Sequence, residues 1–212
     1  MESIWECLRK GMVMKKELYL ILDCSIDFEL LFSQAKQALE GGADKIQLFN
    51  AHRFTNLEIA QLLKLCHHYH ALLLINQDFD FAISNNCDGV HFDELPDSWD
   101  SDKVPTSFLV GLTVGNDENT IKKAIENSVD YISFCSLYPT KSATNCEIIN
   151  HQNIIKASEN FSIPIYVAGG ITPEHLDEIK DWPIAGIAMI TGITEAENIT
   201  ARVKEIKKRI NP

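Results

Sequence analysis

The sequence predicts a single α/β domain folded as a (β/α)₈ TIM barrel. Its 212 residues suffice for one domain with a sizeable core, and 45% of them are hydrophobic. From residue 18 onward, short runs rich in Ile, Leu and Val alternate with amphipathic stretches. The runs are apolar throughout, which is typical of parallel strands that are buried on both faces.

We predict eight strands, and this number favours a barrel. They are residues 18–22, 45–49, 71–75, 89–92, 109–113, 131–135, 163–167 and 185–190. An open doubly wound sheet is the alternative fold. Such a sheet usually has a glycine-rich turn after its first strand, whereas this first strand continues into Asp23, Cys24 and Ser25.

Helical periodicity follows most of these runs, at residues 28–40, 57–69, 117–127, 173–180 and 197–208. Residues 93–106, rich in Asp, Pro and Ser, are predicted to form a long loop with a short helix. Residues 1–16 are too charged for a signal peptide, and no window of the sequence approaches the roughly 18 apolar residues of a membrane span. We therefore expect an N-terminal extension, 1–16, before a barrel domain, 17–212.

The charge of the chain limits its partners. A formal net charge of −11 disfavours binding to nucleic acid or to an anionic membrane. A phosphorylated ligand would have to be held by backbone N–H groups, local cations or a metal. The six cysteines show no CxxC pairing and no secretory signal precedes them, so we expect reduced thiols and a cytoplasmic location.

Two glycines, Gly169 and Gly170, follow the seventh predicted strand in IPIYVAGGIT, residues 163–172. The loops after strands seven and eight of such barrels often bind phosphate. Residues without a Cβ atom let an anion approach the main chain, and their N–H groups can converge on it. Thr172 is the expected N-cap of the following helix, and the backbone after strand eight, at Ile190 and Thr191, is expected to complete the site.

Several motifs occur in the order and spacing of a known family. They are GGADKIQL (41–48), LLLIN (72–76), DFA (80–82), CDGVHF (87–92), VGLT (110–113), VDYISF (129–134), YPT (138–140), IPIYVAGGIT (163–172) and AGIAMITGI (185–193). In these the chain resembles thiamine phosphate synthase and its relative, the thiazole tautomerase, both (β/α)₈ barrels. The resemblance implies a role in thiamin biosynthesis and a phosphorylated heterocycle as the small-molecule ligand.

The resemblance also implies a site in two halves. One half holds a thiazole phosphate on backbone amides, here those of Gly169, Gly170, Ile190 and Thr191. The other half, in the synthase, holds a pyrimidine pyrophosphate with Mg²⁺ and several cations. The thiazole nitrogen then captures the pyrimidine carbocation that remains when pyrophosphate departs.

Carried over to this sequence, the resemblance gives four substrate-binding candidates on the pyrimidine side. Gln47, in strand two, is expected to point toward the barrel mouth, Asn76 ends strand three, Thr113 replaces a family serine, and Thr140 lies in the loop after strand six. His91 belongs to the motif DGVH, and we expect it to bond neighbouring backbone within the barrel.

The pyrophosphate half departs from the family pattern. Phe49 and Ala51 stand where the synthase has Arg and Lys, and Gln77 and Asp78 stand where it has Asp and Arg. Losing these cations should cost several decades in binding and rate unless other groups replace them. Asp78 and Asp93 are the expected replacement ligands, because Mg²⁺ needs only one or two carboxylates besides water and substrate oxygens.

Ser136 and Thr113 are the catalytic candidates. Ser136 occupies the place of the acid/base histidine of the tautomerase, although a serine without a neighbouring base is a poor proton shuttle at neutral pH. Three functions therefore stay open: a synthase with a rearranged metal half-site, a thiazole-phosphate-binding protein without chemistry, and a tautomerase-like enzyme. A homodimer is among the assemblies we expect, although the sequence itself specifies no oligomeric state.

Overall fold

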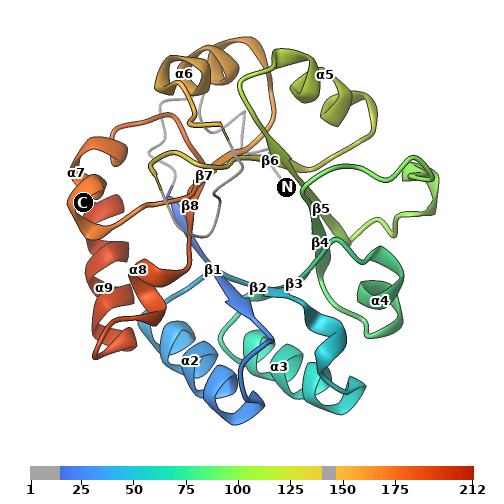
Figure 1. The fold of residues 1–212 in the computed structure, drawn as a ribbon, viewed down its shortest axis with the longest axis vertical. Coiled ribbons are helices and arrows are strands. Elements are labelled where there is room, and N and C mark those ends of the chain that lie inside the picture. The colour runs from blue at the N-terminus through green and yellow to red at the C-terminus, as the bar shows by residue number, and fades with distance from the viewer. Residues whose placement is uncertain (1–14, 140–146) are drawn as a thin grey trace.

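Eight parallel strands close into a barrel in the computed structural model, which describes residues 15–139 and 147–212. Figure 1 shows the ring of strands with helices around its outside. The strands are β1 (Glu17–Asp23), β2 (Lys45–Phe49), β3 (Leu72–Asn76), β4 (Gly89–Phe92), β5 (Leu109–Val114), β6 (Tyr131–Phe134), β7 (Ile165–Ala168) and β8 (Gly186–Met189). The predicted barrel is confirmed, and the open sheet is excluded because β1 pairs with both β2 and β8.

Most of the predicted helices form where their apolar periodicity placed them. These are α2 (Phe28–Gly41), α3 (Asn56–His68), α5 (Glu118–Glu126) and α9 (Ile199–Ile210). The predicted helix 173–180 is instead a 3-10 turn, η4 (Pro173–His175), followed by a single turn, α7 (Leu176–Ile179). The loop 93–106 contains the short helix η2 (Ser101–Lys103). Further elements were not predicted: η1 (Ala51–Arg53), α4 (Phe79–Ser84), α6 (His151–Asn160) and α8 (Thr191–Thr194).

Three tyrosines fill the interior of the barrel. Tyr19, Tyr131 and Tyr166 form a buried cluster separate from the larger core between strands and helices. Two strand glycines make room for them: a Cβ on Gly111 would lie 2.1 Å from the Tyr131 ring, and one on Gly186 would lie 2.7 Å from the Tyr166 ring. The interior is therefore packed by three large side chains that carry a hydroxyl, with Leu74 and small alanines around them.

The interior tyrosines divide into two polar groups. Toward the N-terminal ends of the strands, the Tyr166 hydroxyl contacts Lys45 and Glu17, which pair with each other. Burial lowers the pKa of Lys45 to about 8, with repulsion from Lys207 as a smaller cause. Tyr19 and Tyr131 bond elsewhere, toward the opposite end of the barrel.

A capping box starts α3 and provides a first testable prediction. The Thr55 hydroxyl oxygen accepts from the Glu58 N–H, and the Glu58 carboxylate accepts from the Thr55 N–H at 2.7 Å. We expect Thr55→Ala to lower the free energy of unfolding by about 1 kcal/mol, because the lost hydroxyl accepts from the Glu58 N–H and donates to the Glu58 carboxylate. Urea denaturation would measure it. The same change at the exposed Thr106 is the control, and an equal loss there would refute the capping argument.

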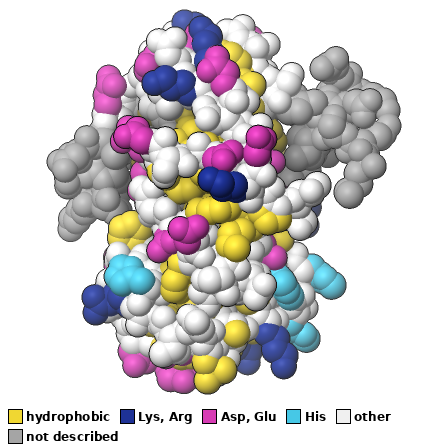
Figure 2. All heavy atoms as spheres, turned by 90° about the vertical axis from the view of Figure 1, so that its right-hand side faces the viewer, with side chains coloured by type: hydrophobic (Ala, Val, Ile, Leu, Met, Phe, Trp, Pro, Cys, Tyr) yellow, Lys and Arg dark blue, Asp and Glu magenta, His cyan; other side chains and the backbone are white. Residues whose placement is uncertain are grey.

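Acidic side chains are scattered over the face drawn in Figure 2, with basic ones interspersed among them. Within the two described ranges, each helix is too short or too polar to cross a membrane. The predicted extension, residues 1–16, falls almost entirely outside the described part of the chain, which begins at residue 15. Its separation from the barrel stays a prediction.

Candidate active site

Two cavities open at the ends of the strands where (β/α)₈ barrels carry their active sites. The larger, of about 830 Å³, lies over the loops after β2, β3 and β4. The smaller, of about 380 Å³, lies over the loops after β6, β7 and β8. Both volumes are within the range of small-molecule sites.

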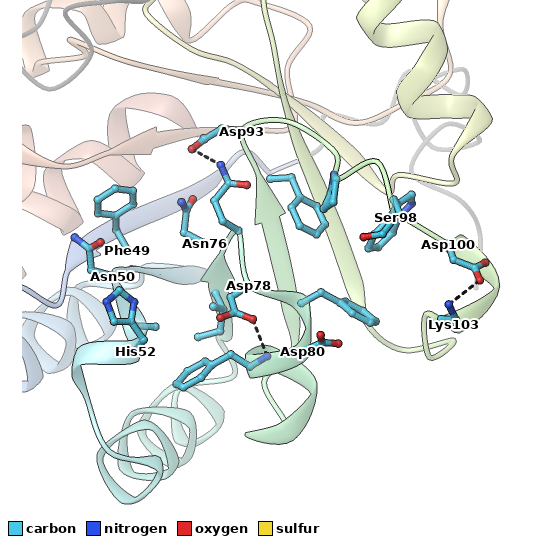
Figure 3. A pocket seen from close by; sticks show the side chains of 18 residues that line it. Phe49, Asn50, His52, Asn76, Asp78, Asp80, Asp93, Ser98, Asp100 and Lys103 are labelled. Atoms are coloured by element: carbon cyan, nitrogen blue, oxygen red, sulfur yellow. Dashed lines mark hydrogen bonds and ion pairs between the residues drawn. The ribbon is translucent and has the colours of Figure 1, made fainter.

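The larger cavity, which we call the acidic cavity, is lined by carboxylates. Asp78, Asp80, Asp93 and Asp100 contribute four of them, against one ammonium, that of Lys103. This Lys103 ammonium is 3.1 Å from the Asp100 carboxylate, at the far side of the cavity in Figure 3. Such a lining repels a polyphosphate without a bound cation. It favours a cation, or a polyphosphate that is bound to one.

The two expected metal ligands have other partners. Asp78 caps α4: its Oδ1 accepts from the Phe81 N–H at 2.9 Å, while the rest of its exposed side chain faces the cavity. Asp93 accepts from Gln77 Nε2 at 2.8 Å, and Gln77 has a left-handed backbone with φ 66°. Figure 3 shows Asp93 at the barrel mouth and Asp78 beside α4. No cluster of three His, Cys, Asp or Glu side chains suited to a metal occurs within residues 15–139 and 147–212.

Three of the predicted site residues are joined by side-chain hydrogen bonds. The Gln47 carboxamide donates to the Asn76 carbonyl and accepts from the Tyr19 hydroxyl. Thr113 is connected through His91, whose Nε2 lies 3.0 Å from the Thr113 hydroxyl. Gln47, Asn76 and Thr113 thus belong to one network at the inner end of the acidic cavity.

His91 does not bond neighbouring backbone, contrary to our expectation. Its two ring nitrogens contact the side chains of Tyr131, at 2.9 Å, and Thr113, at 3.0 Å. Complete burial lowers the pKa of His91 to about 4, and the more distant Asp93 charge opposes this only in part. The imidazole is therefore neutral at physiological pH, with one nitrogen as donor and the other as acceptor.

The smaller cavity, which we call the glycine cavity, has a main-chain wall. The four residues expected to hold a phosphate all line it: Gly169, Gly170, Ile190 and Thr191. In the described part of the chain, none of their amide nitrogens donates to a backbone acceptor. Unpaired N–H groups at a concave surface form an anion site. The carboxylate of Glu195 also lies at its edge.

The expected helix dipole does not contribute to this site. Thr172 does not begin a full helix, because only the η4 turn and one turn of α7 follow it. The Thr172 N–H donates to His175 Nδ1 at 3.1 Å and is thereby withdrawn from any ligand. A cation lies nearby instead, since the Arg202 guanidinium contacts the Gly192 carbonyl at 3.4 Å.

The two glycines are required by the loop after β6 as well as by the cavity. Gly169 has φ 88° and Gly170 has φ 66°, where side chains are strongly disfavoured. A Cβ on Gly169 would lie 2.4 Å from the Ser136 nitrogen, and one on Gly170 would lie 2.5 Å from the Tyr138 carbonyl oxygen. The loops after β6 and β7 are also joined by a bond from the Tyr138 N–H to the Gly169 carbonyl.

Ser136, the expected acid/base residue, is placed behind the glycines. It is 1% exposed, has φ 68° and lines neither cavity, and its hydroxyl has no hydrogen-bond partner among the described residues. Thr140, the remaining substrate-binding candidate, falls in residues 140–146, outside the described part of the chain. The described residues thus offer no proton-transfer group at position 136 that reaches a ligand.

Comparison with known proteins identifies the family. Residues 18–193 match the sequence model for thiamine monophosphate synthase. The chain belongs to the thiamine monophosphate synthase family. It is 31% identical to the thiamine-phosphate synthase of Clostridium perfringens (strain 13 / Type A) over 195 residues, which cover 90% of this chain and 94% of that protein. Family membership, as the sequence motifs implied, is confirmed, and the relatives named are transferases.

Solved structures agree with this assignment. The thiamine phosphate pyrophosphorylase of Pyrococcus furiosus superposes with a TM-score of 0.74 at 25% identity, covering 92% of this chain and 96% of that one. The 3-hexulose-6-phosphate synthase of Salmonella typhimurium gives a TM-score of 0.70 at 14% identity, covering 92% and 98%. The second likeness concerns the fold alone.

The sequence did not predict the hydrogen bonds between side chains in the interior of this thiamine monophosphate synthase barrel. Tyr19 and Tyr131 connect Gln47 to His91, and Gln77 binds Asp93. One signal was present: Tyr19 lies in the middle of an otherwise aliphatic strand, where a hydroxyl needs a buried partner. Which partner it finds depends on pairing between strands that are far apart in the sequence.

Proposed function

We propose that this protein is a thiamine phosphate synthase, which joins a pyrimidine pyrophosphate to a thiazole phosphate. The single observation that supports this most is the glycine cavity, where the amides of Gly169, Gly170, Ile190 and Thr191 surround a volume of about 380 Å³. It adjoins the barrel mouth, where Asn76, bonded from behind by the buried Gln47, would hold the pyrimidine. The described segments span the same barrel as the named relatives.

The reaction requires the two ligands to meet at the mouth of the barrel. The bond between the pyrimidine methylene carbon and the pyrophosphate oxygen breaks, and pyrophosphate leaves with the electron pair. The thiazole nitrogen then forms a bond to that carbon. The chain would contribute by binding both partners in contact and by excluding water from the carbocation.

Mg²⁺ fits the acidic cavity by the chemistry of its lining. Carboxylate oxygens are its preferred protein ligands, and Asp78 and Asp93 would hold it together with pyrophosphate oxygens and water. When bound, Mg²⁺ would neutralise the charge of the leaving pyrophosphate. The absence of a second ammonium beside Lys103 among the residues lining this cavity makes such a cation more important here.

The same lack of cations favours a second candidate, a binding protein that holds a thiazole phosphate without turnover. A pyrophosphate in the acidic cavity would face four carboxylates. The tautomerase alternative is less favoured, because Ser136 is buried outside both cavities.

Turnover by the purified full chain separates these candidates. We expect thiamine phosphate to form from both precursors with Mg²⁺ and to disappear with a chelator. Thiazole-phosphate binding by calorimetry without product would refute the synthase and support the binding protein. Neither binding nor product would refute both.

The metal assignment has its own test. We expect Asp78→Asn to reduce Mg²⁺-dependent turnover by roughly tenfold or more, since an amide is a weaker cation ligand than a carboxylate. Asparagine is as good an N-cap as aspartate, so α4 and the melting temperature should be retained. Asp102→Asn, in η2, is the matched control, since Asp102 is not among the residues that line either cavity. Equal activity of the two variants would exclude Asp78 as a ligand.

A further inference from the structure

Six side chains form one continuous line of hydrogen bonds through the interior of the barrel. In order they are Thr113, His91, Tyr131, Tyr19, Gln47 and Asn76. The Thr113 hydroxyl is 3.0 Å from His91 Nε2, His91 Nδ1 is 2.9 Å from the Tyr131 hydroxyl, and the two tyrosine hydroxyls are 3.1 Å apart. Of the six, only Asn76 lines the acidic cavity.

The middle of this line is closed to water. Tyr19, Tyr131, Gln47 and His91 are each exposed by 6% or less. Buried polar groups have to be satisfied by one another, so each proton must lie between two of them. The ring of His91 also stacks on that of Tyr131, with centroids 5.6 Å apart. The members of the line therefore cannot change partner independently.

Counting protons gives the line a direction. Gln47 presents its carbonyl oxygen to Tyr19, so the single Tyr19 proton is donated to Gln47. The bond between the two tyrosines must then use the Tyr131 proton. Because the Tyr131 proton is donated to Tyr19, the Tyr131 oxygen can only accept from His91. His91 must therefore carry its proton on Nδ1.

The remaining bonds follow from the neutral imidazole. An imidazole with its single proton on Nδ1 has a free lone pair on Nε2, which accepts from the Thr113 hydroxyl 3.0 Å away. Asp93 Oδ1 is a second acceptor within reach of the same hydroxyl, at 3.4 Å, and we assign the single Thr113 proton to the nearer His91 Nε2, at 3.0 Å. At the other end, the Gln47 amide donates to the Asn76 carbonyl, which leaves the Asn76 NH₂ group for the cavity.

We propose that Tyr19, Tyr131 and His91 are positioning residues that fix the Asn76 carboxamide with its NH₂ toward the acidic cavity. A ligand there would have to present an acceptor atom to Asn76, such as a ring nitrogen, rather than a donor. The proposal rests on the proposed function only in naming the pyrimidine as that ligand. A line of opposite direction would end on Asp93 and present the Asn76 carbonyl, which selects for a donor.

Nuclear magnetic resonance of ¹⁵N-histidine in the full chain tests the direction without any ligand. We expect a neutral His91 protonated on Nδ1, the less common tautomer, with its signals assigned among seven histidines by their loss in His91→Asn. Protonation on Nε2 would overturn the proposal. This measurement is independent of turnover, so a failed synthase assay leaves its result intact.

Tyr19→Phe tests the transmission through the line. Tyr19 does not bond His91, but without its hydroxyl the Tyr131 proton is free to be donated to His91 Nδ1. We expect the His91 proton to move to Nε2 in this variant. Tyr166→Phe removes the third interior hydroxyl, which bonds Lys45, and should leave His91 unchanged. The same tautomer in wild type and Tyr19→Phe would overturn the proposal.

Binding gives a second readout. We expect Tyr19→Phe to raise the dissociation constant of the pyrimidine pyrophosphate roughly tenfold, the usual scale for one misdirected hydrogen bond. Thiazole-phosphate binding should be unchanged. Equal weakening of both ligands would indicate a general structural defect and would refute the positioning role. If Tyr19→Phe does not fold, the wild-type tautomer alone decides.

Discussion

Gly169→Ala is expected to lower the free energy of unfolding by roughly 3 kcal/mol or more. Two independent costs combine. Alanine is disfavoured at φ 88°, and its methyl group would lie 2.4 Å from the Ser136 nitrogen and 2.6 Å from the Ser136 Cα. Both contacts are with backbone, so no side chain can rotate away. Chemical denaturation of the variant would measure the loss.

Gly42→Ala separates the two costs. Gly42 also has a positive φ, 99°, at the end of α2, but a Cβ there would meet nothing within 4 Å. We expect a loss of only about 1–2 kcal/mol, from the backbone conformation alone. If Gly169→Ala costs no more than Gly42→Ala, the close approach of the two loops is not a constraint.

The same change should abolish anion binding in the glycine cavity. The loop after β7 can accommodate the methyl group only by moving away from Ser136, and this shifts the amides of Gly169 and Gly170. Calorimetry with the thiazole phosphate should show no binding to folded Gly169→Ala, while Gly42→Ala binds normally. Retained binding would show that other groups hold the phosphate.

The protein should become less stable on mild acidification because of His91. Its pKa is 6.5 in the unfolded chain and about 4 in the fold, since burial disfavours the cation. Between these values the unfolded state binds more protons, so stability is greatest above pH 6.5 and falls as the pH decreases. The total loss is about 3 kcal/mol, of which about 2 kcal/mol should appear between pH 7 and pH 5.

Urea denaturation of wild type, His91→Gln and His68→Gln at several pH values would test this. His91→Gln should remove most of the decrease above pH 5, whatever its effect on absolute stability. His68→Gln changes an exposed side chain and should keep the decrease. Carboxylates with lowered pKa, such as Glu58, lose stability only at lower pH. Parallel curves for wild type and His91→Gln would contradict the assignment.

The barrel could be predicted because its signals are local. Each strand is a short apolar run, and the strongest helices have clear ends, such as Gly42 after α2. Of the helices that were missed, α8 has only four residues, too few to show a period, whereas α6 spans ten and begins at the N-cap Asn150, a signal that could have found it. The predicted helix after Thr172 forms only the η4 turn and the single turn of α7, although the His175 side chain accepts from the Thr172 N–H as in a capping box.

Sequence alone could place residues at the wall of a cavity only where one loop forms that wall. Gly169 and Gly170 line a cavity because both follow the same strand. The environment of Gln47 could not be predicted, because its partners Tyr19 and Asn76 come from other strands. The buried position of Ser136 depends on the backbone of Gly169, 33 residues later by their numbers, and no local pattern encodes that distance.

The contact between the loops after β6 and β7 limits how this barrel could acquire a new chemistry. Ser136 and Gly169 are close through their main chains, so a bulkier side chain in one loop would displace the backbone of the other. Grafting a histidine at position 136 would bury its imidazole against the phosphate loop instead of extending it to a substrate. A change of reaction type would therefore require both loops to be exchanged together.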